Sequence, residues 1–155
     1  MKKLFAAIVS GLLALSFSAT TSAADRGTAD EAVALVKKAA VYLKENGKEI
    51  AFAEFSNPKG QFVDRDLYVF VYSANGDGVN LAHGANPKLI GKNLIDLKDA
   101  DGKPIVKMFV EVANSKSGKG WVDYKWPNPV TKAVEPKSTY IEKVGDVMIG
   151  CGVYK

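Results

Sequence analysis

The stretch DLYVFVYSANGDGVNLAHGANPKLIGKN, residues Asp66–Asn93, decides the fold. Asp66–Tyr72 is β-branched and aromatic with apolar side chains at both alternating sets of positions, which predicts a strand buried on both faces. Residues 75–78 favour a tight turn, and Val79–Ala82 is then expected to run back as a second strand. His83, the only histidine, follows at the end of that strand, where its side chain can face a cleft.

The loop after this histidine is expected to pack against the sheet as a cover. It is rich in Gly, Pro, Asn and Asp, which indicates irregular structure. It nevertheless carries five aliphatic side chains, namely Leu89, Ile90, Leu94, Ile95 and Leu97. A loop with so many apolar residues is expected to lie over an apolar surface.

The residues before the hairpin predict a helical N-terminal part. Thr28 and Glu31 form a T-x-x-E capping box, which indicates a helix that starts near Ala29. Apolar residues then recur at three- and four-residue spacing, so one face of this helix must be buried. Gly47 interrupts the pattern, and Lys48–Phe55 is expected to form a second, shorter helix.

The residues after the hairpin predict one more helix and three strands. Pro104 suits the first turn of an amphipathic helix, which the flexible residues 115–120 end. The two-residue connection Gly145-Asp146 indicates a hairpin between the last two strands. The three strand-like segments are Trp121–Trp126, Ser138–Val144 and Val147–Tyr154. The whole pattern predicts an α+β domain with a central antiparallel sheet of about five strands.

Residues 1–24 are predicted to be a Sec-type signal peptide. Two lysines precede an apolar run over residues 4–19 that is shorter than the roughly 20 residues that span a bilayer, and cleavage is expected after Ala23 or Ala24. An uncleaved membrane anchor is the alternative, and small polar residues within the run argue against it. We therefore expect residues 25–155 to form one periplasmic domain that is not embedded in the membrane.

Composition excludes nucleic-acid binding and a disulfide-stabilised fold. Lys2 and Lys3 belong to the predicted leader, so 19 of the 21 basic residues face 17 acidic ones in the remainder, and they form no basic stripe. Cys151 is the single cysteine, which rules out an intrachain disulfide and a CxxCH haem site. It lies in a strand pattern and is expected to be a buried thiol, with an intermolecular disulfide as the alternative.

Three segments together resemble the single Cache domain family. They are FSNPKGQFVDRDLYVFVY (residues 55–72), NLAHGANPKLIGKNLIDLKDADGKP (80–104) and GWVDYKWPNPVTKAVEPKSTYIEKVGDVMIGCGVYK (120–155). The signatures that carry the resemblance are IGKN, YKWPNP, KSTY and the final GxGVY. Cache domains are PAS-like sensor domains outside the cytoplasmic membrane, found in chemoreceptors and histidine kinases.

The resemblance implies an architecture and a function. A long N-terminal helix should cover one face of the sheet, and a small organic acid should bind on the other face beneath the covering loops. The partner is expected to be a membrane receptor or kinase, no cofactor is expected, and a homodimer is a further option. Most family members continue into a transmembrane segment, whereas this chain ends at Lys155, which predicts a stand-alone module that binds but does not itself signal.

Carboxylate recognition requires charged or polar donors within an apolar cleft. We expect four residues to form the pocket wall and its hydrogen-bond donors, with one of two lysines as the cation. The four are Tyr72, His83, Trp126 and Tyr140, and the lysines are Lys125 and Lys137. Strand alternation cannot place both Lys125 and Trp126 on one face without a bulge, so one of those two assignments should be wrong.

Other interpretations remain open at this point. The tyrosines can equally be core residues, and His83 can be a structural histidine. Asp96, Asp99 and Asp101 suggest calcium, but their spacing does not match an EF-hand loop, and a capping turn is the simpler interpretation. An enzyme is not expected, since one histidine and one distant cysteine form no catalytic arrangement. An interaction subunit without a ligand is the remaining alternative.

Overall fold

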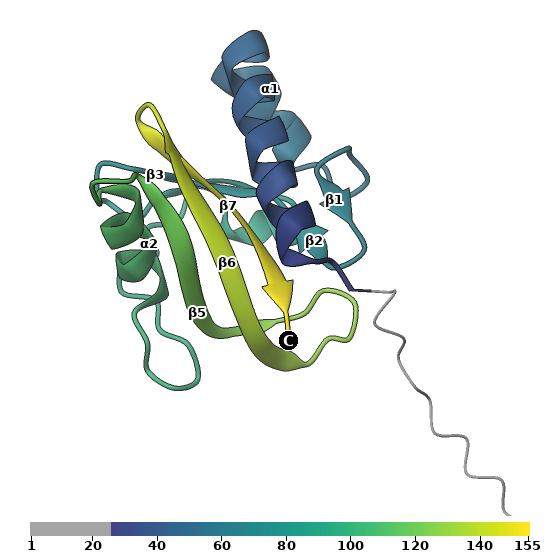
Figure 1. Ribbon diagram of the computed structural model, residues 1–155, viewed down its shortest axis with the longest axis vertical. Coiled ribbons are helices and arrows are strands. Elements are labelled where there is room, and N and C mark those ends of the chain that lie inside the picture. The colour runs from purple at the N-terminus through teal and green to yellow at the C-terminus, as the bar shows by residue number, and fades with distance from the viewer. Residues whose placement is uncertain (1–25) are drawn as a thin grey trace, which may run out of the picture.

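The computed structural model describes residues 26–155 (Figure 1), so the predicted signal peptide lies outside the described residues. Helix α1, Ala29–Phe55, begins with the expected capping box. The Glu31 N–H donates to Thr28 Oγ1 at 3.3 Å, and the Thr28 N–H donates to Glu31 Oε2 at 2.8 Å. Gly47 has φ 77°, outside the helical range, and kinks α1 there. The start and the interruption of the helix are both confirmed.

The main sheet has five antiparallel strands in the order β4-β3-β7-β6-β5 (Figure 1). These strands are β3 (Phe70–Ser73), β4 (Asn80–His83), β5 (Lys119–Pro127), β6 (Val134–Val144) and β7 (Val147–Tyr154). Strands β1 (Val63–Asp64) and β2 (Leu67–Tyr68) form a separate pair, η2 (Pro87–Leu89) is a short 3-10 helix, and α2 spans Ile105–Ala113. The fold is the predicted α+β arrangement.

The prediction of one continuous strand over Asp66–Tyr72 is wrong. Val69 separates β2 from β3, because its N–H donates to Phe62 O on one side while its carbonyl accepts from Gly84 N on the other. The chain therefore changes partners at this residue. The alternation itself is confirmed, since residues 67, 69 and 71 lie in one core and residues 68, 70 and 72 in the other.

The sixth strand begins earlier than predicted, at Val134 instead of Ser138. It passes through Pro136, a residue that cannot donate a ladder hydrogen bond. Pro136 is tolerated because β7 ends at Tyr154, which pairs with Lys137. At Pro136 only the carbonyl forms a hydrogen bond on that side, accepting from Lys155 N at 3.0 Å, so the missing N–H of proline is not needed.

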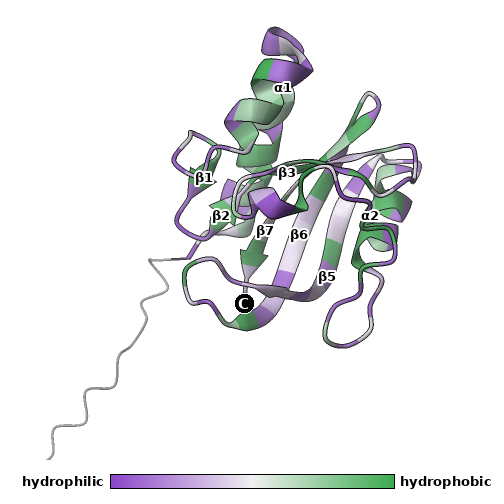
Figure 2. Cartoon of the chain, turned by 180° about the vertical axis from the view of Figure 1, so that it is seen from behind, coloured by the Kyte–Doolittle hydropathy of each residue, from purple (hydrophilic) through white to green (hydrophobic). Residues whose placement is uncertain are grey.

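Two layers cover the two faces of the sheet. Helix α1 packs on one face, where the buried thiol of Cys151 also lies, as predicted. Helix α2 and the loop before it lie on the other face, which Figure 2 shows from behind. Within that loop Leu94, Ile95 and Leu97 pack against the core, while Ile90 is 37% exposed. Among residues 26–155 no helix has the length and apolar character needed to cross a bilayer.

Candidate ligand-binding site

Two adjoining cavities lie on the face of the sheet opposite α1. The inner cavity, of about 10 Å³, is lined by Tyr68, Phe70, Tyr72, His83, Leu97, Ile105, Phe109, Tyr124 and Trp126. The outer cavity, of about 240 Å³, is lined by Tyr68, His83, Ala85, Asn86, Trp126, Pro127, Asn128, Pro129 and Lys132. Three residues are common to both: Tyr68, His83 and Trp126. The inner cavity has room for about one water molecule, so a larger ligand needs the outer cavity or a displaced cover.

His83 enters this site as a neutral hydrogen-bond donor. It is 3% exposed, and its Nδ1 accepts hydrogen bonds from the N–H groups of Ala85 (3.3 Å) and Asn86 (3.0 Å). Because Nδ1 accepts, the neutral ring carries its hydrogen on Nε2. Burial, followed by the nearby charge of Lys137, lowers the pKa of His83 to about 3. The ring is therefore uncharged at neutral pH.

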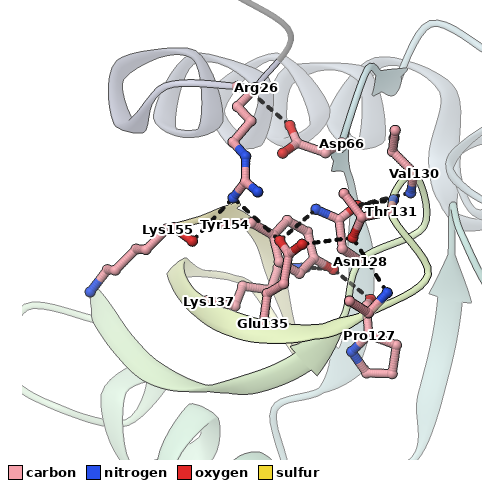
Figure 3. Close-up of polar contacts among 12 residues, drawn as sticks. Arg26, Asp66, Pro127, Asn128, Val130, Thr131, Glu135, Lys137, Tyr154 and Lys155 are labelled. Carbon is pink, nitrogen blue, oxygen red and sulfur yellow. Dashed lines mark hydrogen bonds and ion pairs between the residues drawn. The ribbon is translucent and has the colours of Figure 1, made fainter. Parts of the chain in front are cut away.

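Lys137 is buried without a carboxylate partner. It is 1% exposed, its Nζ donates to Tyr68 Oη at 2.7 Å and to Tyr154 Oη at 3.3 Å, and none of the ion pairs within residues 26–155 involves it. Burial lowers the pKa of Lys137 to about 7. Figure 3 shows Lys137 near Tyr154, to which its Nζ donates.

A glycine on β7 makes room for this lysine. A Cβ at Gly152 would lie 2.5 Å from Lys137 Cε and would also clash with Thr139 Oγ1. No side chain larger than hydrogen therefore fits where the lysine crosses β7. The lysine reaches the ring of Tyr68, with Nζ 4.0 Å from the ring centroid, but does not itself line either cavity. Tyr68 contacts both the lysine and the cavities.

The hydroxyl of Tyr68 is the donor that connects the lysine to the cavities. Tyr154 Oη donates to Pro127 O at 2.8 Å, so its hydrogen is already used. The contact of 3.2 Å between the two tyrosine hydroxyls is then donated by Tyr68. Burial raises the pKa of Tyr68 well above its ordinary value, which keeps it protonated. Its hydrogen bond to Tyr154 is long, so an anion beside Tyr68 can replace Tyr154 as the acceptor of this hydrogen.

A family model described as Single Cache domain 2 matches residues 18–155. The chain belongs to the single Cache domain family. Its sensor layout also agrees with solved structures. The structure of a methyl-accepting chemotaxis protein from Vibrio parahaemolyticus RIMD 2210633 superposes with a TM-score of 0.70 at 27% identity, over 81% of this chain and 86% of that one.

A second solved structure, entitled as the structural basis for carboxylic acid recognition by a Cache chemosensory domain, has a TM-score of 0.67 at 24% identity and covers 81% of this chain and 91% of that one. At that identity it supports the fold alone. Both structures have the PAS-like architecture of this Cache domain, with a long N-terminal helix and an antiparallel sheet.

Two curated relatives are receptors. The sensor histidine kinase MctS of Rhizobium johnstonii is 33% identical over 92 residues, which is 58% of this chain and 19% of that protein. The methyl-accepting chemotaxis protein McpP of Pseudomonas putida is 36% identical over 76 residues, 48% of this chain and 14% of that protein. The matched segment thus spans less than a fifth of the length of each relative. Cache domains of such receptors are extracytoplasmic sensors, not catalytic units.

The Cache domain brings together four of the six predicted site residues. Tyr72, His83 and Trp126 line the inner cavity, and Lys137 lies behind Tyr68. Their contact with a ligand stays a prediction. The expected conflict between Lys125 and Trp126 is resolved in favour of the tryptophan.

The other two predicted residues lie away from the cavities. Tyr140 faces α1 because it alternates with the site-facing residues of β6, and its ring packs 5.5 Å from Trp121 while its Oη donates to Glu142. Lys125 is directed into solvent, where Nζ pairs with Asp101 Oδ1 at 2.9 Å. We therefore correct the predicted site by removing these two residues.

Strand alternation also identifies residues that the prediction missed. Tyr68 shares the face of Tyr72, and Tyr124 shares the face of Trp126, so their side chains reach the same cavity. The hydroxyls of Tyr124 and Thr139 are 2.9 Å apart. Helix α2 contributes Phe109, whose ring stacks 5.4 Å from Phe70; no motif marks that phenylalanine.

The three aspartates of the covering loop have structural partners. Asp99 Oδ1 accepts from the N–H groups of Asp101 and Lys103, both at 2.9 Å, and its Oδ2 accepts from Lys125 N at 2.9 Å. Asp96 pairs with Lys107 at 2.8 Å. Within residues 26–155 no group of three potential metal ligands is found. These contacts hold the turn itself and tie it to β5, while α2 has no side-chain cap, so the helix-capping turn considered from the sequence is wrong.

Proposed function

We propose that this Cache domain is a periplasmic sensory module that binds a small carboxylate in the adjoining cavities and reports it to a membrane receptor or kinase. The observation that carries the proposal is the buried Lys137, which contacts two tyrosine hydroxyls and forms no ion pair with a carboxylate of residues 26–155. A buried cation without a counterion is costly, and an anionic ligand would supply that counterion.

The donors that face the cavities support an anion. His83 presents an Nε2–H and Tyr68 a hydroxyl, while Trp126 and Phe109 supply flat apolar walls. Such a mixture of few donors and aromatic surface is typical of a small-molecule site. The solved Cache chemosensory domain whose title names carboxylic acid recognition shares the fold, which is consistent with this ligand class.

The domain limits and the partners belong to the same proposal. A leader over residues 1–24 would export the domain of residues 25–155 to the periplasm, and the receptor relatives indicate the kind of protein that would read its state. That the module works with a separate receptor, and that it forms a homodimer, are sequence-based expectations that stay predictions.

Thermal unfolding with short carboxylates tests the proposal. Acetate and propionate should raise the melting temperature, since a ligand at about 100 times its Kd stabilises the native state by about 2.7 kcal/mol. Acetamide and propionamide match them in shape without the charge and should cause no shift. Equal behaviour of acids and amides, or no response to either, would reject a carboxylate site.

A substitution at the histidine separates its two nitrogens. His83→Asn retains an acceptor at the position of Nδ1 but removes the Nε2–H, so the loop should stay in place while carboxylate affinity falls about tenfold or more. Lys125→Met is the matched control, since Lys125 lies in solvent away from the cavities, and it should bind as wild type.

A further inference from the structure

We propose that this site takes up a proton when it binds its carboxylate, that the proton is held by Lys137, and that Lys137 acts on the ligand through the hydroxyl of Tyr68. The inference rests on the proposed function and makes Lys137 a positioning residue. It also defines what the module detects, namely a carboxylate together with the acidity of its surroundings.

The first step is the charge around Lys137. The titratable groups close to it come from four strands and one loop: Tyr124 on β5, Tyr154 on β7, Cys151 on the α1 side of β7, Tyr68 on β2, His83 on β4 and Asp66 in the turn before β2. The tyrosines, the thiol and the histidine are neutral at pH 7, because burial raises the pKa of the tyrosines and the thiol and lowers that of His83.

The single acid in this set bonds through one oxygen only. Asp66 Oδ1 accepts from the Gly27 N–H at 2.7 Å just before α1, while its buried Oδ2 has no hydrogen-bond partner, and no cation of residues 26–155 lies within 4.0 Å of this carboxylate. Glu135, the next acid along β6, accepts from Asn128 and Thr131 and pairs with Arg26 (Figure 3). Within the described residues, the ammonium of Lys137 therefore has no carboxylate in ion-pair contact.

The second step is the response of that lysine to an anion. Burial without a counterion weakens the hold on its third proton, so an empty site near neutral pH contains both the amine and the ammonium. A carboxylate that accepts from Tyr68 places negative charge one hydroxyl away from Nζ. The amine then takes a proton from solvent and becomes the ammonium, while the carboxylate stays ionised. By linkage, the ligand binds more weakly as pH rises.

The histidine is not the group that takes this proton. His83 Nδ1 already accepts two N–H groups, and protonating it would break both bonds and leave two backbone donors without an acceptor. The roles of the two basic residues are therefore different: His83 donates from Nε2 at any pH above its own titration, and Lys137 supplies a charge that depends on pH.

Isothermal titration with acetate and propionate tests the proposal. At pH 8, titrations in buffers of different ionisation enthalpy should show net uptake of a proton for each bound ligand. Between pH 7 and 9, Kd should rise by up to tenfold per pH unit. Lys137→Met should bind weakly and without this pH dependence, and Lys125→Met should keep it. His83→Asn should bind more weakly than wild type but with the same slope.

A measurement on the empty wild-type domain tests the inference even if Lys137→Met folds poorly or acetate and propionate do not bind. The titration of Lys137 in the empty wild-type domain is followed by NMR of its Cε and Nζ, with assignment from the Lys137→Met spectrum. A midpoint near neutral pH supports the inference, and a midpoint at the ordinary lysine value overturns it. Acetate binding without proton uptake overturns the inference and leaves the proposed function standing. Failure of both probes to bind overturns the two together.

Discussion

Two buried basic side chains, His83 and Lys137, meet the same group of tyrosines from different strands. The cost of burial is offset differently for each. The histidine is uncharged and its Nδ1 accepts from backbone N–H groups, whereas the lysine donates to two hydroxyls and has a pKa of about 7. The site therefore combines a fixed neutral donor with a titratable cation. This difference makes separate predictions for acidic and alkaline conditions.

The first prediction concerns acid stability. The pKa of His83 is about 3 in the folded protein against an ordinary value of 6.5, so between these values the unfolded chain binds a proton that the folded one does not. The contribution of neutral His83 to the free energy of unfolding is complete above pH 6.5. It is lost as pH falls toward 3, by up to about 1.4 kcal/mol per pH unit. Urea unfolding of wild type and His83→Asn at pH 7, 5 and 4 measures it. Wild type should lose more stability than the variant; parallel losses would contradict the argument.

Alternation explains which site residues were predictable from sequence. Residues 68 and 72 share parity, as do 124 and 126, so the correctly predicted Tyr72 implied Tyr68 and the correctly placed Trp126 implied Tyr124. Lys137 and Tyr140 are three apart on β6 and must face opposite sides, which already excluded using both. The path of the Lys137 side chain past Gly152 was not predictable, since it depends on the pairing of β6 with β7.

At the level of elements, the clearest agreement has a local cause and the clearest error a long-range one. Local signals determined α1, whose capping box and Gly47 kink depend on neighbours within one turn. The division between β2 and β3 at Val69 depends instead on Phe62 and Gly84, which lie in other segments. A period-two pattern predicts which face of the sheet a side chain occupies, but it does not predict which strand the backbone of that residue pairs with.

The second prediction tests the cap of α1. Thr28→Ala removes the acceptor for the Glu31 N–H and should lower the free energy of unfolding by about 1 kcal/mol. Thr28→Ser keeps an oxygen at the same position and is the matched control. Chemical denaturation of the three proteins gives the comparison, and identical midpoints for the alanine and serine variants would contradict a role for the cap.

The third prediction concerns the covering loop before α2. The inner cavity is about 10 Å³, and Leu97 forms part of its wall, whereas Ile90 of the same loop is exposed and lines neither cavity. Leu97→Ala should enlarge the inner cavity and shift preference from acetate toward butyrate and valerate, at a stability cost of about 1 kcal/mol because this leucine is only partly buried. Ile90→Ala should change neither property. Titration calorimetry with the acid series measures the shift, and an unchanged order of affinities would place the ligand in the outer cavity alone.

At the scale of the whole molecule, the sheet divides the Cache domain into a supporting layer and a binding layer (Figures 1 and 2). The α1 face is an apolar core whose aromatic rings, such as Phe55 and Phe62, pack at 4.6 Å. The opposite face carries the buried polar groups of the site and two small cavities. Because the cation without an ion-pair partner lies in the binding layer, an anionic ligand should stabilise that layer.

The fourth prediction follows from the buried Lys137, which has no ion-pair partner within the described residues, and uses the empty domain. The pKa of Lys137 is about 7 when folded and 10.5 ordinarily, so above pH 7 the unfolded chain binds more protons and stability rises with pH. The slope is up to about 1.4 kcal/mol per pH unit. Unfolding free energies between pH 7 and 8.5 isolate it, since Cys151 ordinarily titrates only near 9.0. Wild type and Lys125→Met should show this rise, whereas Lys137→Met should not.

Saturating acetate provides the complementary measurement on the same proteins. A carboxylate beside Tyr68 favours the ammonium of Lys137 and brings its folded pKa back toward the ordinary value, so the rise of wild-type stability between pH 7 and 8.5 should flatten. The stabilisation by acetate is then largest at pH 7 and smaller at 8.5, while Lys137→Met has no such trend. Equal stabilisation of wild type at both pH values, with a clear rise in the empty protein, would mean that the anion binds out of reach of Lys137.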